Sequence, residues 1–232
     1  MHSFQEFFSQ SFQWGGLVNL LIQVAAVLLC LTVHETCHGL AALALGDPTA
    51  KSQHRLSLNP LRHLDFFGTL MMLVAGFGWA KPVMVNPSYF KNPKSGMALT
   101  ALAGPVSNFL LALLALLVRG FVLVPYTLTG GSTAVGYVIQ FLETLAVLSV
   151  GLGLFNLIPF PPLDGSKVAE AFLPDRIYFQ ILRYERWGMV VLVLLLWSGV
   201  LDAPLMAAQR WVLDWMVRVG NLPYFGLMGL LY

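Results

Sequence analysis

The chain has 232 residues, of which 57% are hydrophobic and only 10% are charged. Soluble domains carry about 25% charged residues, so the composition excludes an ordinary soluble protein and predicts a multi-pass integral membrane protein whose partner is the lipid bilayer. A net charge of +2 without any Lys/Arg-rich run indicates that there is no nucleic-acid surface. The sequence carries no signal for an oligomeric state.

The N-terminal residues 1–16 contain no Lys or Arg before the first apolar run, so they lack the basic region that begins a signal peptide. We expect them to form an interfacial segment. The first long apolar run covers residues 17–45, which would be about 43 Å long as a helix. Gly46, Asp47 and Pro48 then predict its end, because they supply a C-terminal glycine and a proline that cannot continue a helix.

Within this run stands the motif His34-Glu35-Thr36-Cys37-His38. Unsatisfied polar groups in hydrocarbon cost several kcal/mol each, so these side chains need a function or a partner. On a helix the H-E-x-x-H spacing presents two neutral imidazoles to one tetrahedral zinc, and it holds Glu35 where it can take a proton from metal-bound water. The alternative is a polar seam that packs two helices. Cys37 lies near enough for a thiolate ligand, but we expect it to pack.

The next stretches are shorter and less regular. Residues 49–58 alternate between polar and apolar side chains, which predicts a short strand near the surface. Residues 66–80 are apolar but contain three glycines and are short for a crossing, so we expect a re-entrant segment or a thin helix. Residues 81–90 alternate weakly and predict a second edge strand.

Clear membrane spans follow near residues 97–118, 136–158 and 187–205. The predicted fold is therefore an all-α polytopic membrane protein with about four to six transmembrane helices and short membrane-associated β-strands. Residues 17–205 form the expected membrane core. Residues 206–232 carry charged side chains among aromatic ones, so they are expected to form an interfacial or a transmembrane helix.

The basic residues predict the orientation of the chain. Three loops hold most of them, and all three lie on one side of the membrane if residues 66–80 do not cross it: Lys51, Arg55 and Arg62; Lys81, Lys91 and Lys94; Lys167, Arg176, Arg183 and Arg186. By the positive-inside rule that side is the cytoplasm. We therefore expect a protein of the cell (plasma) membrane with its active site inside the bilayer, toward the cytoplasmic side.

A catalytic zinc needs a third protein ligand and a fourth position for water, with one zinc per chain. The best candidate is Asp164, in the segment NLIPFPPLDG (residues 156–165), where three prolines break the preceding span. Irregular backbone at membrane depth is tolerated where it lines a cavity or is buried in protein, so this turn could deliver a carboxylate to the metal. The alternative is an ordinary loop with a surface aspartate.

A further marker is the segment AGPVSN, which ends at Asn108. Its small residues permit close helix approach, and Asn108 lies at the membrane depth inferred for His34. The Asn108 amide could bond the backbone of a substrate. It could equally be a hydrogen bond between helices, and the residues alone leave both roles open.

Five motifs occur in order between residues 34 and 165: HETCHGLAALALGDPTAK, RLSLNPLRHLDFFGT, KPVMVNP, ALAGPVSN and FNLIPFPPLDG. Together they resemble the site-2 protease family of intramembrane zinc metalloproteases. The resemblance implies that His34, His38 and Asp164 ligate zinc and that Glu35 is the catalytic base. It also suggests roles near the substrate for Asn108 and Asn156.

The sequence departs from the family pattern at three positions, none of which removes a ligand. Cys37 stands where a smaller residue is usual, His54 stands where glycine often precedes the arginine, and Ser166 stands where glycine often follows Asp-Gly. No soluble regulatory module fits in this length, so the chain resembles a minimal member.

The function expected is that of an intramembrane zinc metalloendopeptidase, which cleaves transmembrane segments of membrane-protein substrates in regulated intramembrane proteolysis. A metal transporter would need ionisable residues along a path and repeated halves, and we find one cluster and no repeat. A serine or aspartyl intramembrane protease would need a Gly-flanked serine with its histidine, or paired aspartates within spans. Neither pattern is present. The alternative is a non-catalytic or metal-transporting polytopic protein with a His/His/Asp site, although Glu35 is retained.

Overall fold

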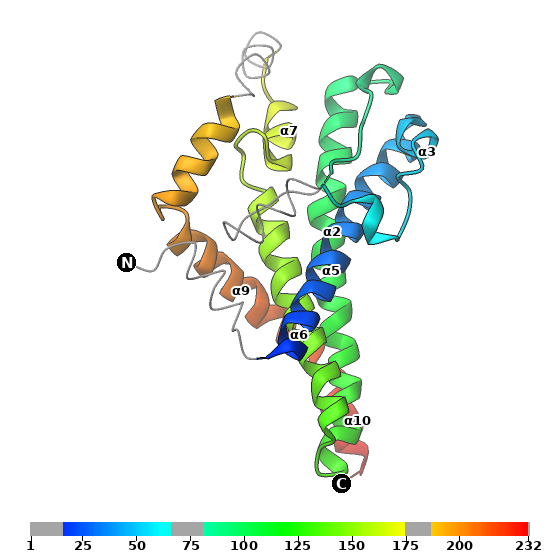
Figure 1. Ribbon diagram of the computed structural model, residues 1–232, viewed down its shortest axis with the longest axis vertical. Coiled ribbons are helices and arrows are strands. Elements are labelled where there is room, and N and C mark those ends of the chain that lie inside the picture. The colour runs from blue at the N-terminus through cyan, green and yellow to red at the C-terminus, as the bar shows by residue number, and fades with distance from the viewer. Residues whose placement is uncertain (1–15, 66–80, 175–186, 232) are drawn as a thin grey trace.

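The computed structural model describes residues 16–65, 81–174 and 187–231, and these form a bundle of helices (Figure 1). The predicted interfacial segment at the N-terminus, apart from Gly16, and the short apolar segment 66–80 lie outside the described residues. The predictions made for those two segments therefore remain predictions.

Three long helices make the centre of the bundle: α2 (Leu17–Ala44), α5 (Pro93–Leu128) and α6 (Thr133–Asn156). Each is long and apolar enough to cross a membrane. All three pack against one another, and the small side chains in their shared core allow the helices to approach closely. Cys30 on α2 and Ser149 on α6 join two of them through a hydrogen bond of 2.9 Å between thiol and hydroxyl.

The helix ends follow from local sequence. α2 stops where the Gly-Asp-Pro signal predicted, and Gly46 there adopts a left-handed φ of 106° that favours glycine. α5 begins with Asn92, whose side-chain oxygen accepts a hydrogen bond from Ser95 N, and with Pro93 in its first turn. The predicted spans near 97–118 and 136–158 thus lie inside α5 and α6.

The predicted strand at residues 49–58 is wrong. Thr49–Ser52 forms the short helix α3, because Asp47 accepts the Thr49 N–H at 2.9 Å and starts a helical turn directly after Pro48. His54 then takes a left-handed φ of 54° and turns the chain. Alternation of polar and apolar residues arises here from a capped turn at the surface.

The second predicted strand is also wrong. Residues 81–86 are extended but belong to no sheet, and no strand occurs anywhere in the part of the chain that the structure describes. Pro82 and Pro87 lack N–H groups, and the Val83 and Asn86 N–H groups donate to side-chain carboxylates. The segment therefore has few main-chain donors left for a ladder.

The predicted single span at residues 187–205 is broken. A helix from Trp187 to Trp197 ends before Gly199, which has a φ of 71°, and α9 (Asp202–Gly220) starts afresh. The two parts are bent by 83°. Among the described helices, three could cross a membrane, or four if the bent pair is one span, so the described residues reach only the lower end of the expected range.

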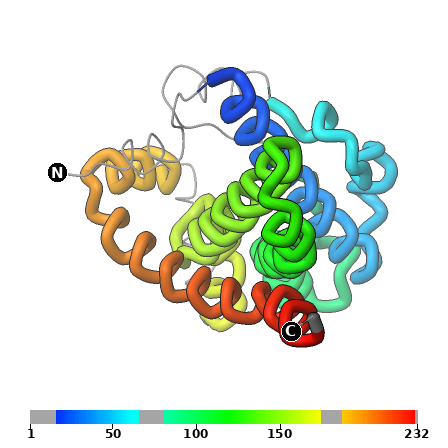
Figure 2. Tube along the Cα trace, turned by 90° about the horizontal axis from the view of Figure 1, so that it is seen from below, coloured from blue at the N-terminus to red at the C-terminus, as the bar shows by residue number. Residues whose placement is uncertain are grey.

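The last helices cover one side of the bundle. α9 packs against α5 and α6, and α10 (Leu222–Leu231) packs against α5. Figure 2 shows α9 and α10 curving around α6 and α5 on the side away from α2. The ends of the bundle differ: α3, the start of α5 and the short helix α7 (Asp164–Glu170) gather at one end, whereas the α5–α6 connection and α10 lie at the other (Figure 1).

The crossing of α5 and α9 generates a prediction. A Cβ at Gly120 would overlap the carbonyl oxygen of Gly220, so the two backbones are in direct contact. We expect Gly120→Ala to force them apart and to lower the free energy of unfolding by about 1–3 kcal/mol, measured by thermal unfolding in detergent. Gly226→Ala is the control, because a Cβ there meets nothing within 4 Å. Equal destabilisation by both changes would contradict the close crossing.

Candidate metal centre

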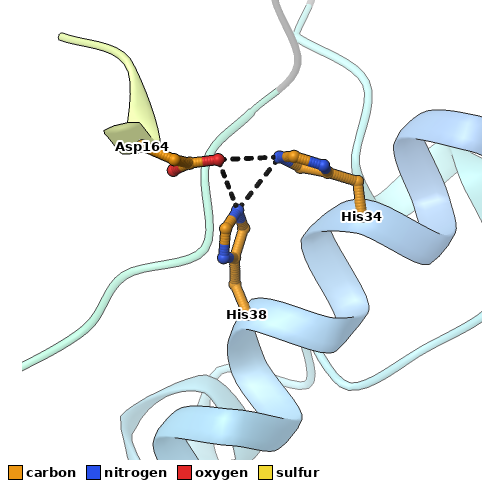
Figure 3. Close-up of side chains that lie close together, drawn as sticks. All are labelled: His34, His38 and Asp164. Atoms are coloured by element: carbon orange, nitrogen blue, oxygen red, sulfur yellow. Dashed lines mark hydrogen bonds and ion pairs between the residues drawn. The ribbon is translucent and has the colours of Figure 1, made fainter. Parts of the chain in front are cut away.

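Two imidazoles and one carboxylate converge at the end of the bundle that holds α7 (Figure 3). His34 and His38 lie one turn apart on α2, and their Nε2 atoms are 3.0 Å apart. Asp164, the first residue of α7, places Oδ2 3.1 Å from Nε2 of His34 and 3.3 Å from Nε2 of His38. The two histidines are only 4% and 9% exposed. The structure thus brings together the three residues predicted to be ligands.

The prolines before Asp164 explain how the chain reaches the histidines. α6 ends at Asn156, and the segment from there to Leu163 contains three prolines and no continuous helix. Gly165 allows the chain to fold back on the end of α6, because a Cβ there would overlap the main chain of Leu157. α7 then begins with Asp164 and packs against α5, which fixes the carboxylate beside α2.

The donor set fits a zinc ion. Zinc takes nitrogen and oxygen ligands at about 2.0–2.2 Å in tetrahedral geometry, which places neighbouring ligand atoms about 3.3–3.6 Å apart. The three ligand atoms are separated by 3.0, 3.1 and 3.3 Å. Burial acts to raise the pKa of Asp164, but the hydrogen bonds and charges of the two histidines hold it at about 2. The carboxylate is therefore ionised at neutral pH, the form that binds a metal.

One face of α5 supports both imidazoles. The Thr100 carbonyl lies 2.8 Å from Nδ1 of His38, and Nδ2 of Asn108 lies 3.1 Å from Nδ1 of His34. A carbonyl can only accept, so Nδ1 of His38 carries a proton, and in the neutral imidazole Nε2 is left with a lone pair for a metal. Gly104 stands between these two supports. A Cβ there would lie 2.5 Å from Nε2 of His38, so only glycine lets α5 approach.

Glu35 lies beside the cluster. Its Oε2 accepts a hydrogen bond of 3.0 Å from the Val83 N–H, and its carboxylate is close enough to His38 to interact with it electrostatically. It is half-buried and is not one of the three grouped residues. Glu35 is therefore adjacent to the three grouped residues without being one of them.

Two other residues that the sequence singled out are not among the grouped ligands. Asn156 is half-buried, and its amide donates to the Leu152 carbonyl of its own helix at 3.0 Å. Cys37 is a half-buried free thiol, and the metal-ligand group among the described residues does not include it.

Sequence reasoning marked the small residues of the AGPVSN segment, which include Gly104, but it missed Thr100 and the main-chain N–H of Val83. The four-residue spacing of Thr100, Gly104 and Asn108 would have shown that they share a helix face. Main-chain groups leave no comparable mark in a sequence.

Comparison with known proteins identifies the family. Residues 118–198 match the model of peptidase family M50. "Putative zinc metalloprotease YwhC" of Bacillus subtilis is 41% identical over 174 residues, which cover 74% of this chain and 78% of the relative. "Putative zinc metalloprotease Rip2" of Mycolicibacterium smegmatis is 26% identical over 200 residues, which cover 84% of this chain and 73% of the relative. No solved structure matches the chain. The chain belongs to peptidase family M50, the site-2 protease family.

Proposed function

We propose that this protein is an intramembrane zinc metalloendopeptidase that cleaves transmembrane segments of membrane-protein substrates. The observation that carries the proposal is the convergence of two imidazole nitrogens and a carboxylate oxygen, with Glu35 beside them, in a bundle of apolar helices. Family membership supports the peptidase activity. The relatives' names support zinc as the metal.

In this proposal His34, His38 and Asp164 hold one zinc ion. When bound, zinc would lower the pKa of a water ligand and polarise the scissile carbonyl. Glu35 takes the proton of the attacking water and passes it to the nitrogen of the leaving amine. Val83 N–H binds Oε2, so Oε1 is the oxygen available to the water.

Asn108 has the contacts of a residue that orients His34. It is fully buried, and its Oδ1 has no hydrogen-bond partner among the described residues. If the amide is turned by 180°, Oδ1 accepts the proton on Nδ1 of His34 and Nε2 is left for the metal. This support of a ligand explains the burial of Asn108 better than contact with a substrate does. Asn156 stays a proposed substrate contact, because its side chain is only half-buried.

A peptide bond inside a helix is shielded by helix packing, so the substrate must unwind locally before it is cut. The extended residues 81–86 lie beside Glu35 and are a candidate support for the unwound segment. Hydrogen bonds between described residues engage the N–H groups of Lys81, Val83 and Asn86, which leaves those of Met84 and Val85 for a substrate strand.

The orientation rests on the positions of the basic loops. The Lys81 N–H donates to the His63 carbonyl at 2.8 Å, so the chain is on the same side of the bundle at residues 63 and 81. α3, the start of α5 and α7 share that end (Figure 1). We place this end, and the metal site near it, toward the cytoplasm of a cell with the protein in its plasma membrane.

Two substitutions test the separate roles of base and ligand. Glu35→Gln removes the base, so cleavage of a single-span model substrate should fall about 10²- to 10⁴-fold while zinc content stays near one per chain.

Asp164→Asn replaces an anionic ligand with an amide, so zinc should be lost to a chelator and activity should partly return with excess zinc. Zinc content is measured by atomic absorption and cleavage by gel.

The parental protein, dialysed against the same chelator, is the control for both measurements. The assignment of the base fails if Glu35→Gln cleaves at the parental rate. The assignment of the ligand fails if Asp164→Asn keeps its zinc against a chelator as well as the parent does.

Gly104 provides a further test of the site's geometry. Gly104→Ala should push a methyl group into both imidazoles and weaken zinc binding about 10- to 100-fold, the usual effect of disturbing groups around metal ligands. Competition with a chelator measures the affinity. Gly136→Ala is the control, because its nearest neighbours would be in ordinary contact at 3.8 Å. Parental affinity in Gly104→Ala would show that α5 does not constrain the rings.

The orientation predicts accessibility to a membrane-impermeant thiol reagent. In a background without Cys30 and Cys37, single cysteines at positions 55 and 91 should be labelled from the cytoplasm, and one at position 130 from the opposite side. Labelling of positions 55 and 91 from opposite sides would overturn the proposed topology.

A further inference from the structure

A second carboxylate near the site is fully buried and has both oxygens in hydrogen bonds. Asp47 has 0% of its surface exposed. Its Oδ1 accepts the N–H and hydroxyl of Thr49, and its Oδ2 accepts the Asn86 N–H at 2.7 Å. Burial acts to raise the pKa of Asp47, but the hydrogen bonds from Thr49 and Asn86 outweigh it and hold the pKa below its usual value. Asp47 is therefore a fixed anion.

Through Asn86, Asp47 holds one end of the extended segment 81–86. The other end is held where the Lys81 N–H donates to the His63 carbonyl. His63 is itself buried, and its Nε2 lies 2.7 Å from the Ser57 carbonyl. The segment is thus attached on both sides of Val83 to parts of the chain that are themselves held in place.

Val83 lies between these two attachments, and its N–H donates to Oε2 of Glu35 at 3.0 Å. Among the described residues this is the only hydrogen bond that the Glu35 carboxylate makes. A glutamate side chain has three rotatable bonds, so its carboxylate points in one direction only if a partner holds it. Here that partner is a main-chain group whose position depends on Asp47.

We infer that Asp47 is a positioning residue for peptide-bond hydrolysis. It acts through Asn86 and the Val83 N–H to set the direction of the Glu35 carboxylate. The inference rests on the proposed function, in which Glu35 is the base. A carboxylate displaced by about 1 Å from the attacking water can lose of the order of 100-fold in rate, so a residue without contact to the substrate can control the turnover.

The test is Asp47→Asn in the full-length protein, assayed with a single-span model substrate. The asparagine Oδ1 can still accept from Thr49, but its NH₂ group faces the Asn86 N–H, so two donors meet and the segment is released. We expect kcat to fall about 10- to 100-fold, while KM stays within about twofold and zinc content is unchanged. A purely structural role would lower zinc content together with activity.

Asp214→Asn is the matched control. It makes the same chemical change at an exposed aspartate of α9, which has no part in the site. Its kcat should stay within about twofold of the parental value.

If Asp47→Asn does not give a folded protein, Asn86→Pro tests the same contact from the other side. It removes the N–H and leaves Asp47 intact, and the φ of Asn86 must shift from −109° by about 45° to the value that proline requires. It should show the same loss of kcat with its zinc retained. Parental kcat in either variant overturns the inference. So does loss of zinc in both variants, because Asp47 then serves only the fold.

Glu35→Gln separates the two ideas. If it cleaves at the parental rate, the proposed function fails. If it is inactive while Asp47→Asn keeps the parental kcat, only the role of Asp47 fails.

Discussion

Three atoms with lone pairs face one another at about 3 Å in a buried part of this membrane protein, and the architecture around them serves that contact. In the neutral imidazole of His38 the proton lies on Nδ1, where the Thr100 carbonyl accepts it, so Nε2 carries a lone pair. An ionised Asp164 adds a negative charge. Such a group is unfavourable in an apolar bundle unless a cation completes it, so ion binding and folding are linked at this site.

The long helix α5 is the support for that contact. It presents a carbonyl, a glycine and an amide at four-residue intervals, so one helix face meets both imidazoles. The middle position has no side chain, which allows the outer two to reach Nδ1 of each ring. Metal ligands commonly depend on such partners for their orientation. Here the partners lie more than sixty residues away from the histidines.

Local sequence patterns predicted the parts of the structure that depend on neighbouring residues. The H-E-x-x-H spacing, the end of α2 and the spans inside α5 and α6 are of this kind. The two predicted strands failed because a capped turn after Asp47 and an extended segment between two prolines also alternate in polarity. Hydropathy likewise could not detect the bend at Gly199, since both sides of it are apolar. The partner of Glu35 is a main-chain group, which no residue type reveals.

α2 carries both histidines and Glu35, so these three side chains move as one rigid unit. Their remaining partners come from elsewhere: α7 supplies Asp164, and the extended segment supplies the Val83 N–H. In the proposed mechanism, zinc binding and proton transfer therefore depend on different segments of the chain. A displacement of residues 81–86 would remove the partner of Glu35 without touching a zinc ligand, whereas a displacement of α7 would take Asp164 away from the metal. The two contributions to the chemistry can thus be lost separately.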